Sequence, residues 1–301
     1  MSPSLQFQLF RLMMPFLRRS QAQFPVRDRD ALVRFRKRSE RLANIIIPLP
    51  RGVMRETSSI SGVAGDWLTP PNVSDGPVIV FLHGGGIIFG WSNPNRRIVA
   101  YIAKFSGVRA FGVDYRLAPE HRYPAAHDDC FTVYRTLVHQ GKQVVLIGES
   151  SGGVLALATL LRARAQALPQ PALCALISPT VDYGFQDARI WNSHDVFADP
   201  KFVVDLHKHY IAQHDTRLPD LSPVDADLTG LGPLWVLAAE HDVLRGEAER
   251  LAEAAKRHDL KLELTLWPHV WHAWDLFVPL LPEATQALKM LGGVVRQHVR
   301  P

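Results

Sequence analysis

Short apolar runs alternate with segments of helical pattern over most of the chain. Six mostly apolar runs end at a glycine, a proline or a polar residue: Val78–Leu82, Val108–Val113, Val144–Ile147, Ala172–Ile177, Leu234–Ala239 and Leu262–Trp267. Such runs predict strands that are buried on both faces of a sheet. Helical spacing occurs in Gly153–Leu168, Glu247–His258 and Glu283–His298. The alternation predicts an α/β fold with a mostly parallel central sheet flanked by helices.

Two regions break this alternation. Residues 1–50 have a helical pattern without strands, and residues 183–228 form a long insertion rich in aromatic residues and histidine. A helical insertion beside the carboxyl ends of a parallel sheet is well placed to cover an active site. We therefore expect one catalytic core, formed by residues 51–182 and 229–301, under a helical cap formed by residues 1–50 and 183–228.

Composition and charge narrow the function classes. The chain is 47% hydrophobic and 21% charged, as in ordinary globular proteins. Its net charge of +5 comes from residues 1–50, which hold ten Lys and Arg against three acids. Basicity confined to one segment argues against a nucleic-acid partner. We interpret it as a solvated helix face, with contact to a membrane surface as the less favoured alternative.

Cysteine content and the N-terminal pattern bear on location. Cys130 and Cys174 are too few for a disulfide framework, and we expect free thiols in the cytoplasm. Neither has a CxxC or histidine-rich context, so no metal site is predicted. The apolar stretch 5–17 is interrupted by polar residues and its positive charges follow it, so we expect neither a secretory signal nor a membrane span.

Two glycine-rich motifs carry candidate chemistry. Gly148, Glu149, Ser150, Ser151 and Gly152 fit the pattern G-x-S-x-G between a predicted strand and a predicted helix, where a nucleophilic serine stands on a tight turn. His83, Gly84, Gly85 and Gly86 directly follow an earlier predicted strand. Consecutive glycines leave backbone N–H groups free to bind an oxyanion, and the N–H of Ser151 would join them.

A serine nucleophile requires a base and an orienting acid at the ends of later strands. Asp242 and His272 follow the fifth and sixth predicted strands, in the order Ser–Asp–His of an α/β-hydrolase. By spacing alone, Glu240 and Asp275 compete as the acid, and His269 competes as the base.

Longer segments resemble one family. The sequence is similar to the hormone-sensitive-lipase-like branch of the α/β-hydrolases, the bacterial family IV carboxylesterases. The resemblance rests on HGGG, GESSGG, DYRLAPEHRYPAAHDD (114–129), the region 222–257 and PHVWHAW (268–274). It extends from about residue 50 to the end of the chain. The chain departs from the family pattern at Glu149-Ser150-Ser151, where Asp-Ser-Ala is usual, at Gly246, and at Ala273-Trp274.

The resemblance implies a serine esterase for small-molecule esters with short to medium acyl chains, and no cofactor. It places the nucleophile at Ser150, the base at His272 and the acid at Asp242. We expect Gly84, Gly85 and Ser151 to donate N–H groups to the oxyanion. Alternatives are a lactone or N-acyl hydrolase with the same triad, a membrane-associated lipid hydrolase, and a non-catalytic ligand-binding protein on the same fold. The sequence predicts no oligomeric state.

Overall fold

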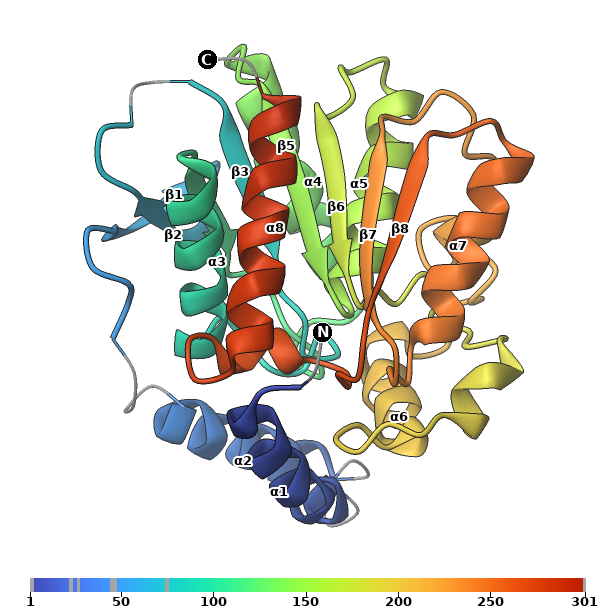
Figure 1. The fold of residues 1–301 in the computed structure, drawn as a ribbon. Coiled ribbons are helices and arrows are strands. Elements are labelled where there is room, and N and C mark those ends of the chain that lie inside the picture. Colours follow the sequence, from blue (N-terminus) through green and yellow to red (C-terminus); the bar gives the residue numbers. More distant parts are fainter. Residues whose placement is uncertain (1–2, 22–23, 26–27, 44–47, 74–75, 300–301) are drawn as a thin grey trace.

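An eight-stranded sheet forms the centre of the molecule, in the order β1-β2-β4-β3-β5-β6-β7-β8 (Figure 1). The computed structural model describes residues 3–299 except 22–23, 26–27, 44–47 and 74–75. The strands are β1 (Met54–Ile60), β2 (Val63–Thr69), β3 (Val78–Leu82), β4 (Arg109–Val113), β5 (Val144–Glu149), β6 (Leu173–Ile177), β7 (Leu234–Ala239) and β8 (Leu262–Trp267). The α-helices are α1 (Leu5–Gln21), α2 (Arg29–Ala43), α3 (Asn93–Ser106), α4 (Ala125–His139), α5 (Gly152–Ala165), α6 (Pro200–Ile211), α7 (Arg245–Arg257) and α8 (Pro282–His298). Short 3₁₀ helices are η1 (Ala188–Asn192), η2 (Pro223–Asp225) and η3 (Trp274–Phe277).

The parallel part of the sheet confirms the predicted fold class. Strands β4, β3, β5, β6, β7 and β8 run parallel to one another and correspond to the six predicted strands. Strands β3, β5, β6 and β7 are buried along their whole length, as continuous apolar runs predict. The prediction of burial on both faces is wrong for β8. Its residues are half-buried or exposed, because β8 is an edge strand with a neighbour on one side only.

Strands β1 and β2 form an antiparallel hairpin that the apolar pattern does not predict. They meet at a two-residue turn in which Ser61 and Gly62 both have positive φ, as type I′ hairpin turns require. Strand β2 then pairs antiparallel with β4 and so extends the sheet. Residues of β1 are mostly exposed, so their composition carries little hydrophobic signal.

Helices cover both faces of the sheet. Helices α3 and α8 pack together over one face, in front of the sheet in Figure 1, and α4, α5 and α7 contribute to the core on the other face. The carboxyl ends of the parallel strands lie at the lower edge of the sheet in this view. The loops that carry the sequence motifs therefore gather at this edge.

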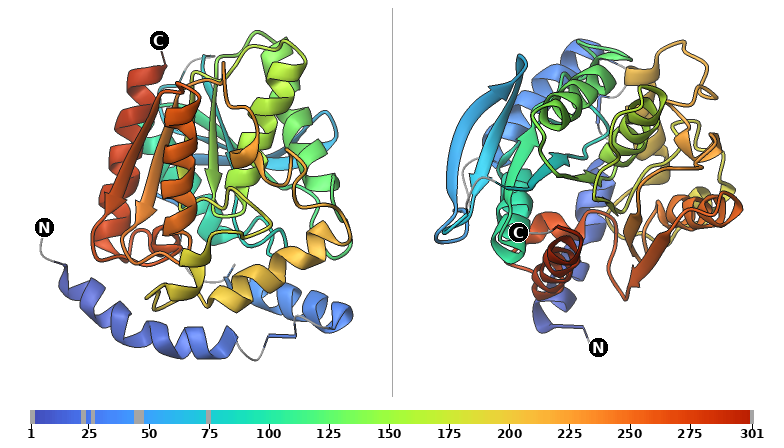
Figure 2. Two further views of the ribbon diagram at one scale, coloured as in Figure 1. Left: turned by 90° about the vertical axis from the view of Figure 1, so that its right-hand side faces the viewer. Right: turned by 90° about the horizontal axis from the view of Figure 1, so that it is seen from above.

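Helices α1, α2 and α6 lie beneath this edge (Figures 1 and 2). Gln21 at the end of α1 donates a hydrogen bond to the carbonyl oxygen of Phe197 at 2.8 Å and accepts one from the N–H of Asp199 at 3.0 Å. Arg36 of α2 donates to the carbonyl oxygen of Ala118 at 3.2 Å. Within the predicted cap segment 1–50, residues 1–2, 22–23, 26–27 and 44–47 lie outside the described residues. No helix in the described ranges is long and apolar enough to cross a bilayer.

Candidate active site

Ser150 stands on a tight turn between β5 and α5. Its φ is +51°, a left-handed conformation that is costly for a serine and typical of functional positions. A Cβ at Gly148 would lie 2.4 Å from the carbonyl oxygen of Gly152, and a Cβ at Gly152 would lie 2.1 Å from that of Leu82. Both glycines of G-x-S-x-G are therefore needed for the close approach of strand, turn and helix.

The structure brings Ser150, His272 and Asp242 together from three loops. Ser150 Oγ lies 3.0 Å from His272 Nε2, and His272 Nδ1 lies 2.8 Å from Asp242 Oδ1. With its proton on Nδ1, His272 donates to Asp242 and can accept the proton of Ser150. Ser178, at the end of β6, donates a hydrogen bond to Asp242 Oδ2. The arrangement matches a nucleophile, a base and an orienting acid.

Buried charges set the protonation of this triad. Burial lowers the pKa of His272, but the charge and hydrogen bond of Asp242, together with the charges of Asp195 and Glu149, outweigh burial and raise it. Burial raises the pKa of Asp242, but the His272 charge and hydrogen bonds from His272 and Ser178 bring it below its usual value. Asp242 is thus ionised at neutral pH and stabilises a protonated His272.

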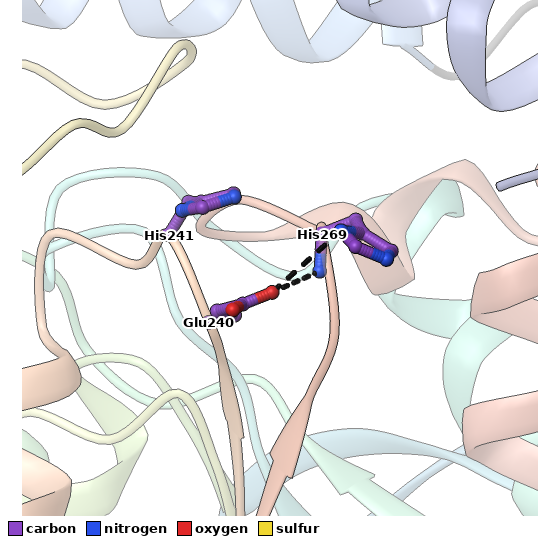
Figure 3. Close-up of side chains that lie close together, drawn as sticks. All are labelled: Glu240, His241 and His269. Carbon is purple, nitrogen blue, oxygen red and sulfur yellow. Dashed lines mark hydrogen bonds and ion pairs between the residues drawn. The ribbon is translucent and has the colours of Figure 1, made fainter. Parts of the chain in front are cut away.

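The competing acids and base are placed elsewhere. Glu240 accepts a hydrogen bond from the N–H of His269 at 2.7 Å, and its carboxylate is directed at that residue (Figure 3). Both side chains are exposed by more than a third. Asp275 is fully buried, but its carboxylate has no hydrogen-bond partner among the described residues. His272 therefore pairs with Asp242 and with none of these competitors.

Glu240, His241 and His269 are also the one group in the described ranges whose ligand atoms could surround a metal ion. These atoms all lie within 4.8 Å of one another. However, Glu240 Oε2 is already held by the backbone of His269, and the group carries a single formal negative charge. We assign no metal to it.

The loop after β3 holds the predicted oxyanion donors, and the geometry corrects one of them. The N–H of Gly84 donates to Glu149 Oε2 at 2.6 Å, so Gly84 is not supported as an oxyanion donor. The N–H of Gly86 donates to Ser151 Oγ at 3.0 Å. No described residue accepts a hydrogen bond from the N–H of Gly85 or of Ser151. These two donors remain available.

Glu149 and His83 hold this loop in shape. Burial raises the pKa of Glu149, against the charge of His272 and the hydrogen bond from Gly84. His83 is stacked on Tyr115, with ring centroids 4.1 Å apart, and burial lowers the pKa of His83 to about 4. His83 is therefore neutral at pH 7. Its Nδ1 lies 2.8 Å from the carbonyl oxygen of Gly84, which places it behind the loop as a structural residue.

Asp195 is a buried site residue that sequence reasoning missed. Its Oδ2 accepts hydrogen bonds from the N–H of His272 at 2.8 Å and of Val243 at 3.0 Å. Asp195 belongs to the insertion between β6 and β7, so the predicted cap segment 183–228 contacts the loops of His272 and Asp242 at once. No sequence motif identifies Asp195, because the groups that it binds are backbone N–H groups, which almost any residue can supply.

A cavity of about 570 Å³ lies against Ser150 and His272. Five phenylalanines in its wall come from distant segments: Phe24, Phe35, Phe89, Phe197 and Phe202. Residues of both predicted cap segments line it, among them Leu17 of the first and Leu206 of the second. Trp271 and Trp274 are fully buried and are not part of the wall. The cavity is of the size and apolar character of small-molecule sites.

Comparisons with known proteins agree with this geometry. The family model described as an alpha/beta hydrolase fold matches residues 79–276. The putative acetyl-hydrolase LipR of Mycobacterium tuberculosis is 31% identical over 254 residues, which cover 83% of this chain and 82% of the relative. A solved variant of the esterase E40 superposes with a TM-score of 0.88 at 30% identity, over 99% of both chains.

A further solved structure, described as an esterase from the bacterial hormone-sensitive lipase family, superposes with a TM-score of 0.85 at 29% identity, over 99% of both chains. These relatives carry the names of hydrolytic enzymes, so the alternative of a non-catalytic binding protein is not supported. The chain therefore belongs to the hormone-sensitive-lipase-like branch of the α/β-hydrolase family and is a carboxylic ester hydrolase.

Proposed function

We propose that this enzyme hydrolyses carboxylic esters with short to medium acyl chains through a covalent acyl-enzyme on Ser150. One observation carries the proposal: Ser150 Oγ, the His272 ring and Asp242 form an unbroken hydrogen-bonded chain with lengths of 3.0 and 2.8 Å. Ser150 and His272 line the apolar cavity, where an acyl group can be held.

The reaction proceeds in two halves. Ser150 Oγ attacks the ester carbonyl carbon while His272 Nε2 takes its proton, and the N–H groups of Gly85 and Ser151 stabilise the oxyanion. The tetrahedral intermediate expels the alcohol, which receives the proton from His272. Water then attacks the acyl-enzyme with His272 as the base again, and the carboxylic acid leaves as Ser150 recovers its proton. Each oxyanion donor of this kind is worth about 2.7–4 kcal/mol of barrier.

The cavity wall supports the acyl-chain preference. Phe24 contacts both Phe35 and Phe202, with ring centroids 4.1 and 4.7 Å away, and these rings form an apolar part of the cavity wall. An alkyl chain gains about 0.8 kcal/mol for each CH₂ that it buries there. Charged acyl groups would lose their hydration without a partner, so they should be poor substrates.

The test is a panel of p-nitrophenyl esters of increasing acyl length, with lactones and N-acyl amides of matched size. We expect ester hydrolysis, with the highest kcat/KM among short and medium chains. Ser150→Ala and His272→Ala should each lower kcat by about 10⁴-fold or more, because the triad acts as a unit.

His269→Ala is the matched control, since it removes a neighbouring histidine whose side chain pairs, in the described part of the chain, with Glu240 alone. It should leave kcat near the wild-type value. Unchanged turnover in Ser150→Ala would overturn the proposal. Faster hydrolysis of lactones or amides than of esters would overturn the proposed substrate class but would leave the proposed catalytic triad in place.

A cytoplasmic location remains part of the proposal. It is supported by Cys130 and Cys174, which are both buried and unpaired. Fractionation of the native host would test it.

A further inference from the structure

Helix α1 is apolar on two opposite faces. Phe7 and Met14 point into the protein and are almost completely buried. Leu5, Leu9, Leu12 and Phe16 follow one another at intervals of four, three and four residues, so they share the opposite face. Together with Met13 they are exposed by 56–72%. Exposed apolar patches of this kind on a soluble protein mark an interaction surface.

Exposed positive charge lies on the same two helices. Arg19 is exposed on α1, and Arg34, Lys37, Arg38 and Arg41 are exposed on α2. None of these five side chains forms an ion pair with another residue in the described ranges. Helices α1 and α2 lie together along the base of the molecule, outside the carboxyl ends of the strands (Figures 1 and 2).

We propose that the base formed by α1 and α2 binds the surface of an anionic lipid bilayer. An apolar helix face bordered by Lys and Arg lies in the plane of the bilayer, with its apolar side chains in the acyl boundary and its cations at the headgroups. The same helices supply Leu17 and Phe35 to the wall of the catalytic cavity. A bound enzyme therefore has its cavity next to the lipid from which an apolar ester would come.

The charge distribution favours lipid over a second copy of the chain. A symmetric dimer through α1 would place the same patch on both subunits and bring its cations together. Like charges facing each other across an interface oppose association, whereas anionic headgroups neutralise them. Membrane binding goes beyond the proposed function, and it is measured without ester turnover. A failure of the membrane proposal can therefore be distinguished from a failure of the proposed esterase activity.

The experiment measures co-sedimentation of the full chain with unilamellar vesicles. We expect binding to an equal mixture of phosphatidylcholine and phosphatidylglycerol, weaker binding to phosphatidylcholine alone, and loss of the difference at high salt. Leu9→Gln/Leu12→Gln/Phe16→Gln should lower the partition coefficient by about 50-fold or more. Hydrolysis of soluble p-nitrophenyl butyrate should stay at the wild-type level and report an intact fold.

Two matched controls sharpen the test. Leu12 and Met54 are exposed by 72% and 70%, but Met54 lies on the edge strand β1. Leu12→Gln should weaken binding about tenfold and Met54→Gln should not. Likewise, Lys37→Gln/Arg38→Gln/Arg41→Gln should weaken binding to anionic vesicles.

Lys256→Gln/Arg257→Gln/Lys261→Gln removes three exposed cations at the opposite end of the sheet and should leave vesicle binding unchanged. The proposal would be overturned if the wild type did not bind anionic vesicles, or if the variants of α1 or α2 and their controls lost vesicle binding equally. It would also be overturned if the chain formed a dimer that the α1 variant dissociates while vesicles fail to bind.

Discussion

Replacing Gly84 by alanine tests the contact between the loop after β3 and the residue before the nucleophile. A Cβ at this position would lie 2.4 Å from Glu149 Oε2, 2.7 Å from its Cδ and 2.8 Å from its Oε1. All three distances are well below van der Waals contact, and the Glu149 side chain is buried beside the catalytic cavity. The loop and Glu149 must therefore separate.

The expected cost follows from two terms. Overpacking the close contact between Gly84 and Glu149 costs about 1–3 kcal/mol. Loss of the hydrogen bond from Gly84 to a buried carboxylate costs a further 1.5–3 kcal/mol or so. Because Gly85 is the next residue, displacement of the loop should also cost one oxyanion donor, about 10²–10³-fold in kcat.

A double-mutant cycle isolates the contact. In the Glu149→Ala background the obstructing carboxylate is absent, so adding Gly84→Ala should cost about 2 kcal/mol less than it does in the wild type. Urea denaturation gives the free energies of unfolding, and p-nitrophenyl butyrate gives kcat. Gly293→Ala is the control, because its Cβ would meet only Arg296 at 3.9 Å on α8, and it should stabilise by about 0.5–1 kcal/mol. Costs for Gly84→Ala that agree within about 0.5 kcal/mol in both backgrounds would refute the reasoning.

Two further predictions concern the surroundings of the triad. Asp195 raises the pKa of His272 by its charge, and His272 must be neutral to act as the base. Asp195→Asn should therefore lower this pKa and move the acid limb of the kcat/KM profile to lower pH; a limb that stays in place or moves up would contradict the argument. Ser151→Ala removes the acceptor of the buried Gly86 N–H and should destabilise the fold by about 1–3 kcal/mol in thermal denaturation. It keeps the backbone N–H of Ser151, so kcat should fall far less than in Ser150→Ala.

Much of the fold could be predicted because its signal is local. Each buried strand is a continuous apolar run, since parallel strands covered by helices on both faces expose few positions to water. The edge strand β1 has no such signal: its residues are mostly exposed, and it pairs only with β2. Strand β8 carries an apolar run yet is partly exposed, because sequence does not show which strand lies last in the sheet.

The triad was proposed from sequence for a related reason. Ser150 is fixed by glycines within two residues of it, and Asp242 and His272 each follow a predicted strand by a few residues. Spacing alone left Glu240 and Asp275 as alternative acids and His269 as an alternative base. The resemblance to a family favoured Asp242 and His272 over them. The hydrogen bonds of His272 are consistent with that choice, whereas Glu240 and His269 bond to each other.

The loop after β3 contains a feature that could not be predicted from the sequence. Three consecutive glycines offer three N–H groups, and the sequence favoured those of Gly84 and Gly85 as oxyanion donors. Which of them remain available depends on acceptors 65 residues away: Glu149 takes the N–H of Gly84, and the hydroxyl of Ser151 takes that of Gly86. Both acceptors flank the nucleophile, at the positions where this chain departs from the usual Asp-Ser-Ala. Glu149 and Ser151, which flank the nucleophile, therefore also select the proposed oxyanion donor. A substitution at either one should alter the donor geometry even when Ser150, His272 and Asp242 stay in place.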